Sequence, residues 1–240
     1  MTTQRRVQQQ AAYILHHRPF RDTSQILDLL SRDHGKLSVV ARGSRGARSR
    51  LKGILRPFMP LSASWVIKSD LGTLTGAEVS TAPLRLSGNA LLSCYYVNEL
   101  ILHFLHRHDP QPEIFDAYDH TIRALAAAGD DIAVCLRQFE IELLRQIGYA
   151  LNLDHEYGSN KVLEPKQHYE YRPEQGPVAV SRNEGPQVFS GEVLIAIGEQ
   201  QFHDATVLRS ANRLLRDVIA FHLGGKELKS RKVLLDMRKL

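Results

Sequence analysis

Six lysine and arginine side chains between positions 42 and 56 are the residues of this sequence best suited to binding chemistry. The segment ARGSRGARSRLKGILRPF interleaves them with three glycines and two serines. Glycine lets a backbone approach a polyanion closely, and guanidinium groups pair with phosphates in bidentate fashion. No apolar residue is expected to anchor the loop rigidly. The pattern predicts a phosphate-binding loop, with a solvated linker as the alternative. The six cations are Arg42, Arg45, Arg48, Arg50, Lys52 and Arg56.

The distribution of charge along the chain supports a polyanion site. Residues 1–60 have a net charge of +9, residues 61–220 of −8 and residues 221–240 of +4. Such an asymmetry is typical of a basic binding surface built from both ends of a chain. A second basic cluster lies in GGKELKSRK and extends the surface if the C-terminus folds back beside the loop, whereas a solvated tail is the alternative. Its members are Lys226, Lys229, Arg231 and Lys232.

Aromatic side chains near the loop are candidates for base stacking. Single-strand binders commonly add such platforms to a basic groove. Phe20 and Phe58 lie beside turns and arginines, and we expect them to be the stacking residues. Tyr13 and Trp65 lie in strand-like runs and are expected in the core. Binding that depends mainly on the phosphate backbone predicts little sequence preference.

No motif for enzymatic chemistry is present. The only Gly-Gly-Lys, at 224–226, is followed by Glu227 and has no glycine at position 219 or 220, so it is no P-loop. G-x-S-x-G and H-E-x-x-H are also absent. The sequence therefore predicts a binding protein that is not an enzyme and needs no cofactor. Two alternatives stay open: a metal-dependent nuclease built from scattered carboxylates, and a protein-binding adaptor with incidental DNA contact.

The elements that must position the loop begin with five strand-like runs between about Ala11 and Ser80. The runs are AAYILHH, SQILDLLS, GKLSVVA, LSASWVIK and LGTLTGAEV. Five short strands in about 70 residues predict a small closed barrel, for which the oligonucleotide/oligosaccharide-binding (OB) fold is the common solution. An SH3-like barrel fits nearly as well. SQILDLLS also fits a helix, because its apolar residues do not alternate strictly.

The rest of the chain predicts a mainly helical domain. Helical periodicity runs from about residue 82 to 148 with breaks near 109–112 and 129, and returns from about 191 to 224. Residues 152–190 read as an irregular insertion with a small hairpin at YEYR and PVAVS. The fold class is α+β, with an OB-fold domain at 1–81 and a helical domain at 82–240 that ends in a basic tail at 224–240.

No apolar run is long enough to span a membrane, and the N-terminal sequence lacks the apolar region of a secretory signal. The expected location is the cytoplasm, in association with the nucleoid. Cys94 and Cys135 lie in apolar stretches and are expected to be free thiols rather than a disulfide.

Taken together, these segments resemble the RecO family of bacterial recombination mediators. The resemblance runs nearly end to end, and only the combination of segments makes it specific. It rests on AYILHHRPFRDTSQILDLL, ARGSRG with LKGILRPFMPL, LSCYYVNELI, LRQFEIELLRQIGYALNL, FSG with LRSANRLLR, and LGGKELKSRKVL. The resemblance implies binding of single- and double-stranded DNA and annealing of complementary strands, including strands coated by single-strand-binding protein (SSB). It also implies loading of RecA with the help of RecR.

The resemblance further implies that the helical domain binds the acidic, apolar C-terminal tail of SSB. The matching helix carries Arg137 beside Leu136, Phe139 and Ile141. A cation next to an apolar groove suits a tail that ends in a carboxylate. The alternative is that Arg137 pairs with a carboxylate of its own helix, such as Glu140 or Glu142.

Many members of the family hold zinc through four cysteines in the irregular insertion. This chain has no cysteine there, and His155 and His168 are too few ligands for structural zinc. We therefore expect a zinc-finger-like insertion without zinc, held by packing.

Overall fold

A computed structural model describes residues 5–68, 70–129 and 131–237. The chain forms two compact units, one comprising Met1–Gly129 with Leu228–Leu240 and the other Asp130–Glu227. The predicted domain boundary after residue 81 stays a prediction. The helices that come directly after the barrel belong to the same compact unit as the barrel. We describe each unit by itself.

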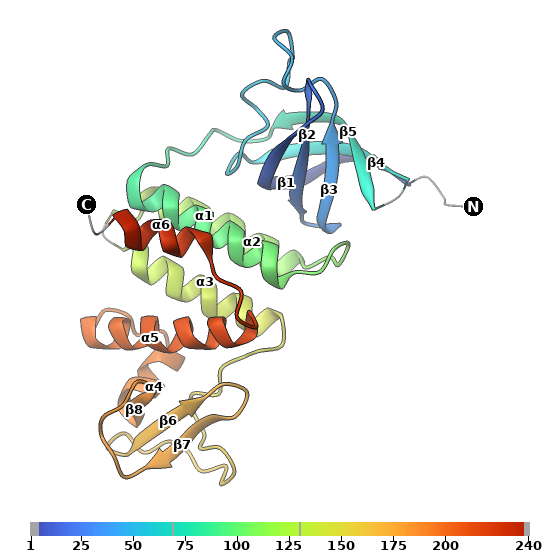
Figure 1. The fold of residues 1–240 in the computed structure, drawn as a ribbon. Coiled ribbons are helices and arrows are strands. Elements are labelled where there is room, and N and C mark those ends of the chain that lie inside the picture. The colour runs from blue at the N-terminus through green and yellow to red at the C-terminus, as the bar shows by residue number, and fades with distance from the viewer. Residues whose placement is uncertain (1–4, 69, 130, 238–240) are drawn as a thin grey trace. The chain divides into compact units, whose positions relative to one another are not determined.

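The first unit contains a closed five-stranded barrel, which confirms the predicted OB fold (Figure 1). Its strands follow the order β1-β2-β3-β5-β4, in which β3 and β5 run parallel and the other pairs antiparallel. Closure leaves no unpaired edge along the barrel. The strands are β1 (Arg5–Phe20), β2 (Ser24–Ser31), β3 (Gly35–Ala41), β4 (Leu61–Ile67) and β5 (Leu71–Val79).

Strand β2 explains why SQILDLLS does not alternate strictly. Leu27 and Leu29 point into the barrel core, and Ile26 and Leu30 beside them are also buried, whereas Asp28 between them is partly exposed. A strand buried on both faces reads as an apolar run instead of an alternation. The helical alternative for this segment is therefore wrong.

Helices α1 (Gly88–Phe104) and α2 (Pro112–Ala127) complete the first unit with α6 (Lys229–Met237). Asn98 of α1 donates to the backbone oxygen of Leu15 at 2.7 Å and accepts from the Tyr118 hydroxyl of α2 at 2.6 Å. At the turn between β2 and β3, Gly35 has φ +64°, and a Cβ there would lie 2.1 Å from the Asp109 carbonyl oxygen. Only glycine allows this close approach.

The second unit contains α3 (Ile132–Gln146), a three-stranded antiparallel sheet, and helices α4 (Gly191–Gly198) and α5 (Ala205–His222). The predicted hairpin is confirmed as β6 (His168–Arg172) and β7 (Gly176–Val180). The sequence did not indicate the third strand, β8 (Val188–Ser190), which pairs with β6.

The helical pattern expected from about 191 to 224 is confirmed and consists of two helices. Gln200 adopts φ +56°, which an α-helix excludes. Asp204 then starts α5, since its side chain accepts hydrogen bonds from the amides of Thr206 and Val207. The basic tail likewise contains a helix, α6. No helix in the described part of the chain has the length and apolar character needed to cross a membrane.

Candidate nucleic-acid interface

The basic loop, residues 42–56, joins β3 to β4 and is held more firmly than its composition predicts. Leu55 and the following Met59 are buried in the barrel core, and Leu51 and Ile54 pack against it. Successive backbone hydrogen bonds fold the loop into tight turns, among them Gly46 to Gly43 and Ser49 to Gly46. The expectation that no apolar residue anchors the loop is wrong. Four aliphatic side chains fix its second half, so its cations extend from an ordered base.

All six cations of the basic loop are exposed. The structure pairs none of them with a carboxylate of the residues that it describes. Unpaired guanidinium and ammonium groups keep their full capacity to bind phosphate. The loop is therefore arranged as a polyanion site requires.

The turn between β1 and β2 lies against the start of the basic loop. The Arg45 amide donates to the Thr23 carbonyl oxygen at 2.8 Å, and the Gly43 amide to the Ser24 hydroxyl at 3.4 Å. The Arg21 guanidinium lies 5.3 Å from the centre of the partly exposed Phe20 ring. Phe20 and Arg21 thus lie at the start of a turn whose last residue bonds to the loop, and Phe20 stays a predicted stacking residue. Sequence reasoning missed Arg21, because only hydrogen bonding between the turn and the loop indicates it.

Phe58 is 6% exposed and therefore has no free face for a base in this structure. Its ring meets the edge of Tyr95 of α1, with ring centres 4.9 Å apart and planes at 77°. Tyr95 itself is 44% exposed. The burial of Phe58 disfavours it as a stacking residue and points to Tyr95 in its place. Which of these two rings is exposed depends on how the loop packs on α1, and no local pattern in the sequence indicates it.

Helix α6 is attached to α1 through Glu99. The Glu99 carboxylate accepts from the backbone amides of Lys229 at 2.8 Å and Ser230 at 2.9 Å, and from the Ser230 hydroxyl at 2.6 Å. These bonds satisfy amides that a helix start leaves unpaired, and a carboxylate there also complements the helix dipole. Glu99 thus acts as an N-cap supplied by another helix.

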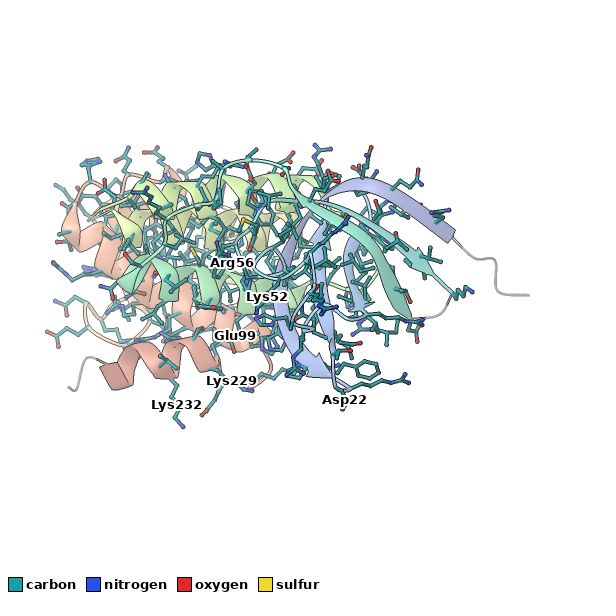
Figure 2. The ribbon with its side chains drawn as sticks, turned by 90° about the horizontal axis from the view of Figure 1, so that it is seen from above. Asp22, Lys52, Arg56, Glu99, Lys229 and Lys232 are labelled. Atoms are coloured by element: carbon teal, nitrogen blue, oxygen red, sulfur yellow. The ribbon has the colours of Figure 1, made fainter. Side chains whose placement is uncertain are left out.

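Tyr95 and Glu99 lie four residues apart on α1, so they are neighbours on one helical face. Tyr95 contacts Phe58, which lies two residues after the end of the basic loop, and Glu99 binds the start of α6. In the view of Figure 2, Glu99 lies between Lys52 and Arg56 on one side and Lys229 and Lys232 on the other. One stripe of α1 therefore joins the end of the basic loop to the start of α6.

The second basic cluster is divided by the fold. Lys229 and Lys232 are exposed on α6 and Arg231 is partly exposed, and all three belong to the first unit. Lys226 is exposed but belongs to the second unit. We call the basic loop, Tyr95 and the three α6 cations the composite basic surface. Its acidic neighbours include Glu99 and, on the β1–β2 turn, the exposed Asp22 (Figure 2).

Arg137, in the second unit, is buried with 7% exposure. Its guanidinium donates to Glu140 on the same helix and to Asn212 of α5. Of the two alternatives that the sequence left open for Arg137, the structure contains the ion pair with a carboxylate of its own helix, Glu140. Phe139 is also buried, whereas Leu136 and Ile141 are partly exposed. A carboxylate from another molecule has to displace Glu140 to reach this arginine.

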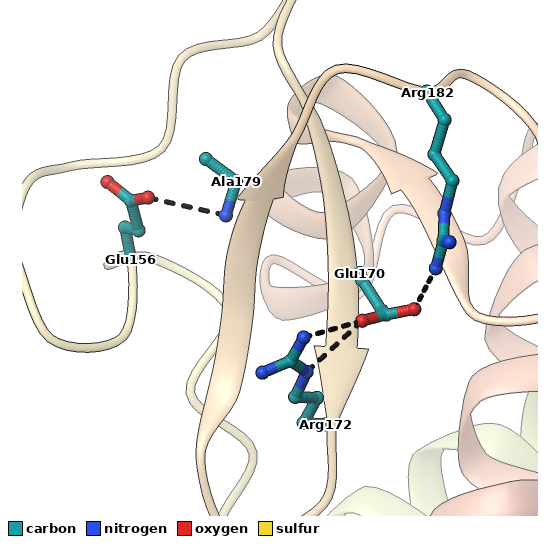
Figure 3. Close-up of polar contacts among 5 residues, drawn as sticks. All are labelled: Glu156, Glu170, Arg172, Ala179 and Arg182. Atoms are coloured by element: carbon teal, nitrogen blue, oxygen red, sulfur yellow. Dashed lines mark hydrogen bonds and ion pairs between the residues drawn. The ribbon is translucent and has the colours of Figure 1, made fainter.

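The irregular insertion of the second unit does not fit a zinc ion. No group of three or more His, Cys, Asp or Glu side chains with the arrangement of a metal site occurs in the described ranges. Carboxylates bond instead to protein groups (Figure 3). Glu156 accepts from the Ala179 amide at 3.3 Å, and Glu170 accepts from both Arg172, at 2.9 Å, and Arg182. Hydrogen bonds and ion pairs hold these strands and loops together.

Packing also stabilises the insertion. Tyr169 is buried, and its hydroxyl accepts from the Glu164 amide at 2.9 Å. Phe189 is buried beneath the Arg213 guanidinium, which lies 4.3 Å from the ring centre. A cation over an aromatic face is an attractive contact.

Two family models match consecutive parts of the chain. The one described as Recombination protein O N terminal matches residues 5–83, and the one described as Recombination protein O C terminal matches residues 85–232. The chain is 39% identical over 243 residues to a DNA repair protein RecO of Dechloromonas aromatica, with 100% of both chains covered.

Other relatives with the same name give similar values. The chain is 40% identical over 242 residues to a DNA repair protein RecO of Burkholderia lata, covering 100% of this chain and 86% of the relative. It is 40% identical over 237 residues to that of Nitrosococcus oceani, covering 98% of this chain and 96% of the relative.

Proposed function

The chain belongs to the recombination protein O family, whose members are DNA repair and recombination proteins and not enzymes, and on that premise we propose that it anneals complementary DNA strands. Single- and double-stranded DNA bind to the composite basic surface. The observation that carries the proposal is the pair Tyr95 and Glu99, through which one face of α1 links the cations of the basic loop to those of α6.

Annealing brings two polyanions onto one protein, and their mutual repulsion opposes it. A surface with many unpaired cations lowers that repulsion because each bound phosphate releases condensed counterions. A loop alone offers one row of cations, whereas a loop joined to a basic helix offers two. The two strands therefore occupy neighbouring parts of the composite basic surface.

The substrate in the cell is single-stranded DNA coated by SSB. We propose that the second unit binds the SSB tail at Arg137 with Leu136, Phe139 and Ile141, and that the protein then acts with RecR to load RecA. Because Arg137 is paired with Glu140, tail binding exchanges one carboxylate for another. Calorimetry with an SSB-tail peptide tests this step, and unchanged affinity in Arg137→Ala would remove Arg137 from the site.

A fluorescence assay with complementary labelled strands tests annealing directly. We expect Arg45, Arg48 and Arg50→Ala together to abolish annealing at moderate salt, with or without SSB on the strands. The matched control is Lys161, Lys166 and Arg209→Ala, which removes three exposed cations from the second unit. Annealing that survives in the first variant would favour the adaptor alternative. Addition of RecR and RecA to the coated strand then measures RecA loading.

The same strands incubated with magnesium test the nuclease alternative. We expect no cleavage by the wild-type protein. Cleavage that persists in the triple-arginine variant would overturn a function limited to binding and annealing.

A further inference from the structure

A cavity of about 200 Å³ lies within the second unit, where the ends of α3 and α5 meet the β6–β7 hairpin. Its walls come from the segment Gly148–Asn152 after α3, from Tyr171 and the hairpin turn, and from Val218 and His222 of α5. Pockets for drug-sized ligands are roughly 300–1,000 Å³. The volume of this cavity instead suits a single side chain. Nothing in the proposed annealing mechanism uses it.

The Tyr171 hydroxyl is an unused hydrogen-bonding group in this cavity. Tyr171 is only 4% exposed, and it lines the cavity. The structure shows no hydrogen bond from its hydroxyl to another residue that it describes, and this oxygen is not one of the fully buried atoms without a partner, so it is reachable from the cavity. Burial raises the pKa of Tyr171, so the group stays protonated and keeps both a donor and an acceptor function. Buried polar groups normally have partners, and the cavity is where a partner for this one can bind.

The electrostatics of the cavity favour a cation. Helices α3 and α5 both end here, and a helix C-terminus carries partial negative charge. Glu174 contributes a carboxylate, and no lysine or arginine is among the described lining residues. Burial lowers the pKa of His222, against the opposing effect of Glu174, which favours the neutral form of this ring. The described lining thus contains a carboxylate and no cationic side chain to balance it.

An aromatic wall gives the cavity a preference for a planar group. The rings of Tyr149 and His222 stack with centres 3.9 Å apart and planes at 18°, and Tyr149 is 44% exposed. Aromatic faces attract cations, and a guanidinium also stacks on such a face. Elsewhere in the lining, Gly176 at φ +99° lies against Asn152, whose Nδ2 a Cβ would approach to 3.2 Å. A side chain at position 176 would be strained and would crowd Asn152.

We propose that this cavity binds the arginine side chain of a partner protein, with the guanidinium stacked on Tyr149 and paired with Glu174. The Tyr171 hydroxyl oxygen then accepts a hydrogen bond from an N–H group of this guanidinium. Arginine fits better than lysine because its planar fork uses the aromatic wall and the carboxylate together. Nucleic acid is the wrong chemistry, since phosphate would meet a carboxylate and two helix C-termini. The site is therefore a protein-docking site, separate from the composite basic surface.

A peptide titration of the full-length protein tests the proposal. The probe is a blocked Gly-Arg-Gly tripeptide, followed through the NMR signals of labelled tyrosine and histidine rings. Blocked Gly-citrulline-Gly has nearly the same shape without the charge, and Gly-Lys-Gly has the charge without the plane. We expect the arginine peptide to shift the Tyr149 and His222 signals, and the citrulline peptide to bind at least tenfold more weakly. Equal binding of arginine and citrulline peptides would overturn the proposal.

Variants locate the binding. Glu174→Gln and Tyr149→Ala change exposed side chains, and each is expected to lower the affinity for the arginine peptide about fivefold or more. Tyr157→Ala is the control, because Tyr157 is 51% exposed in the same unit and does not line the cavity. Unchanged affinity in both site variants, or displacement of the peptide by oligothymidylate, would contradict an arginine site. Annealing by Glu174→Gln is expected to equal that of the wild type, which separates this proposal from the proposed function.

Discussion

The basic loop and the second unit differ in how they use arginine. The first unit has a net charge of +10 and the second of −5. Among the residues that the structure describes, the cations of the basic loop are exposed and pair with no carboxylate, whereas arginines 137, 145, 172, 182 and 216 of the second unit are paired with carboxylates. Pairing consumes the capacity of an arginine for phosphate. Whether an arginine has a partner therefore distinguishes a binding role from a structural role better than its position in a basic segment.

The exposed tyrosines extend this comparison. Tyr95 and Tyr149 are each 44% exposed, and each contacts another aromatic ring. Tyr95 contacts Phe58 at the end of the basic loop, whereas Tyr149 lines a cavity with Glu174 and two helix ends. Similar side chains are thus expected to bind opposite partners, a base in the first unit and a guanidinium in the second.

The largest expected effect comes from removing loop cations. Arg45, Arg48 and Arg50→Ala together remove three phosphate contacts, which flattens the log–log salt dependence of single-strand binding by about 2 and lowers affinity about 100-fold at 0.1 M salt. Fluorescence anisotropy across a salt series measures both quantities. Lys161, Lys166 and Arg209→Ala should leave both unchanged, and an equal loss in that variant would erase the distinction between the units.

Helix α6 provides the next test. Lys229 and Lys232→Ala together remove two contacts and should weaken single-strand binding about 25-fold at 0.1 M salt. The same anisotropy series applies. Combining this variant with the loop variant tests whether the two groups form one surface. If both groups contact the same DNA strand, the combined variant is expected to bind that strand more weakly than either variant alone. Wild-type affinity in the α6 variant would confine the site to the loop.

A smaller effect is expected at Tyr95. Phe58 already contacts the Tyr95 ring, so Tyr95→Ala should cost about 1 kcal/mol, or roughly fivefold in affinity for single strands, at the lower end for base stacking. Tyr95→Phe retains the ring and should bind normally. Tyr149→Ala is the control of equal exposure. A Tyr149 variant that loses as much affinity as Tyr95→Ala would reverse the assignment of the two tyrosines.

The smallest effect concerns the attachment of α6. Glu99→Gln keeps one acceptor oxygen, replaces the other with an amide NH2 group and removes the charge at the helix start, which should cost about 0.5 kcal/mol. Amide hydrogen exchange at residues 231–233 is expected to become about twofold faster. Glu78→Gln changes an exposed carboxylate of the barrel and should not alter this exchange. Unchanged protection in Glu99→Gln would mean that apolar packing alone holds α6.

Much of the fold was predictable because local patterns carry it. Alternation and turn residues indicated five strands, and three- and four-residue spacing indicated α1, α2 and α3. The division between α4 and α5 was missed because their apolar residues continue in register across Gln200 and Asp204. Strand β8 was missed because three residues are too few for a pattern, and only pairing with β6 defines it.

The candidate site was predictable in composition but not in arrangement. Runs of arginine and glycine identify the loop directly, since charge and backbone freedom are properties of single residues. Anchoring by Leu55 and the burial of Phe58 depend on what packs against them, which local sequence does not contain.

By itself the sequence determined the family, the barrel and the excess of positive charge at both ends of the chain. Tertiary structure alone decided which charges stay unpaired, which tyrosine faces outward and where α6 docks. The physical reason is range: strand and helix patterns arise between near neighbours, whereas Glu99 lies 130 residues from Lys229 and meets it only in the folded unit.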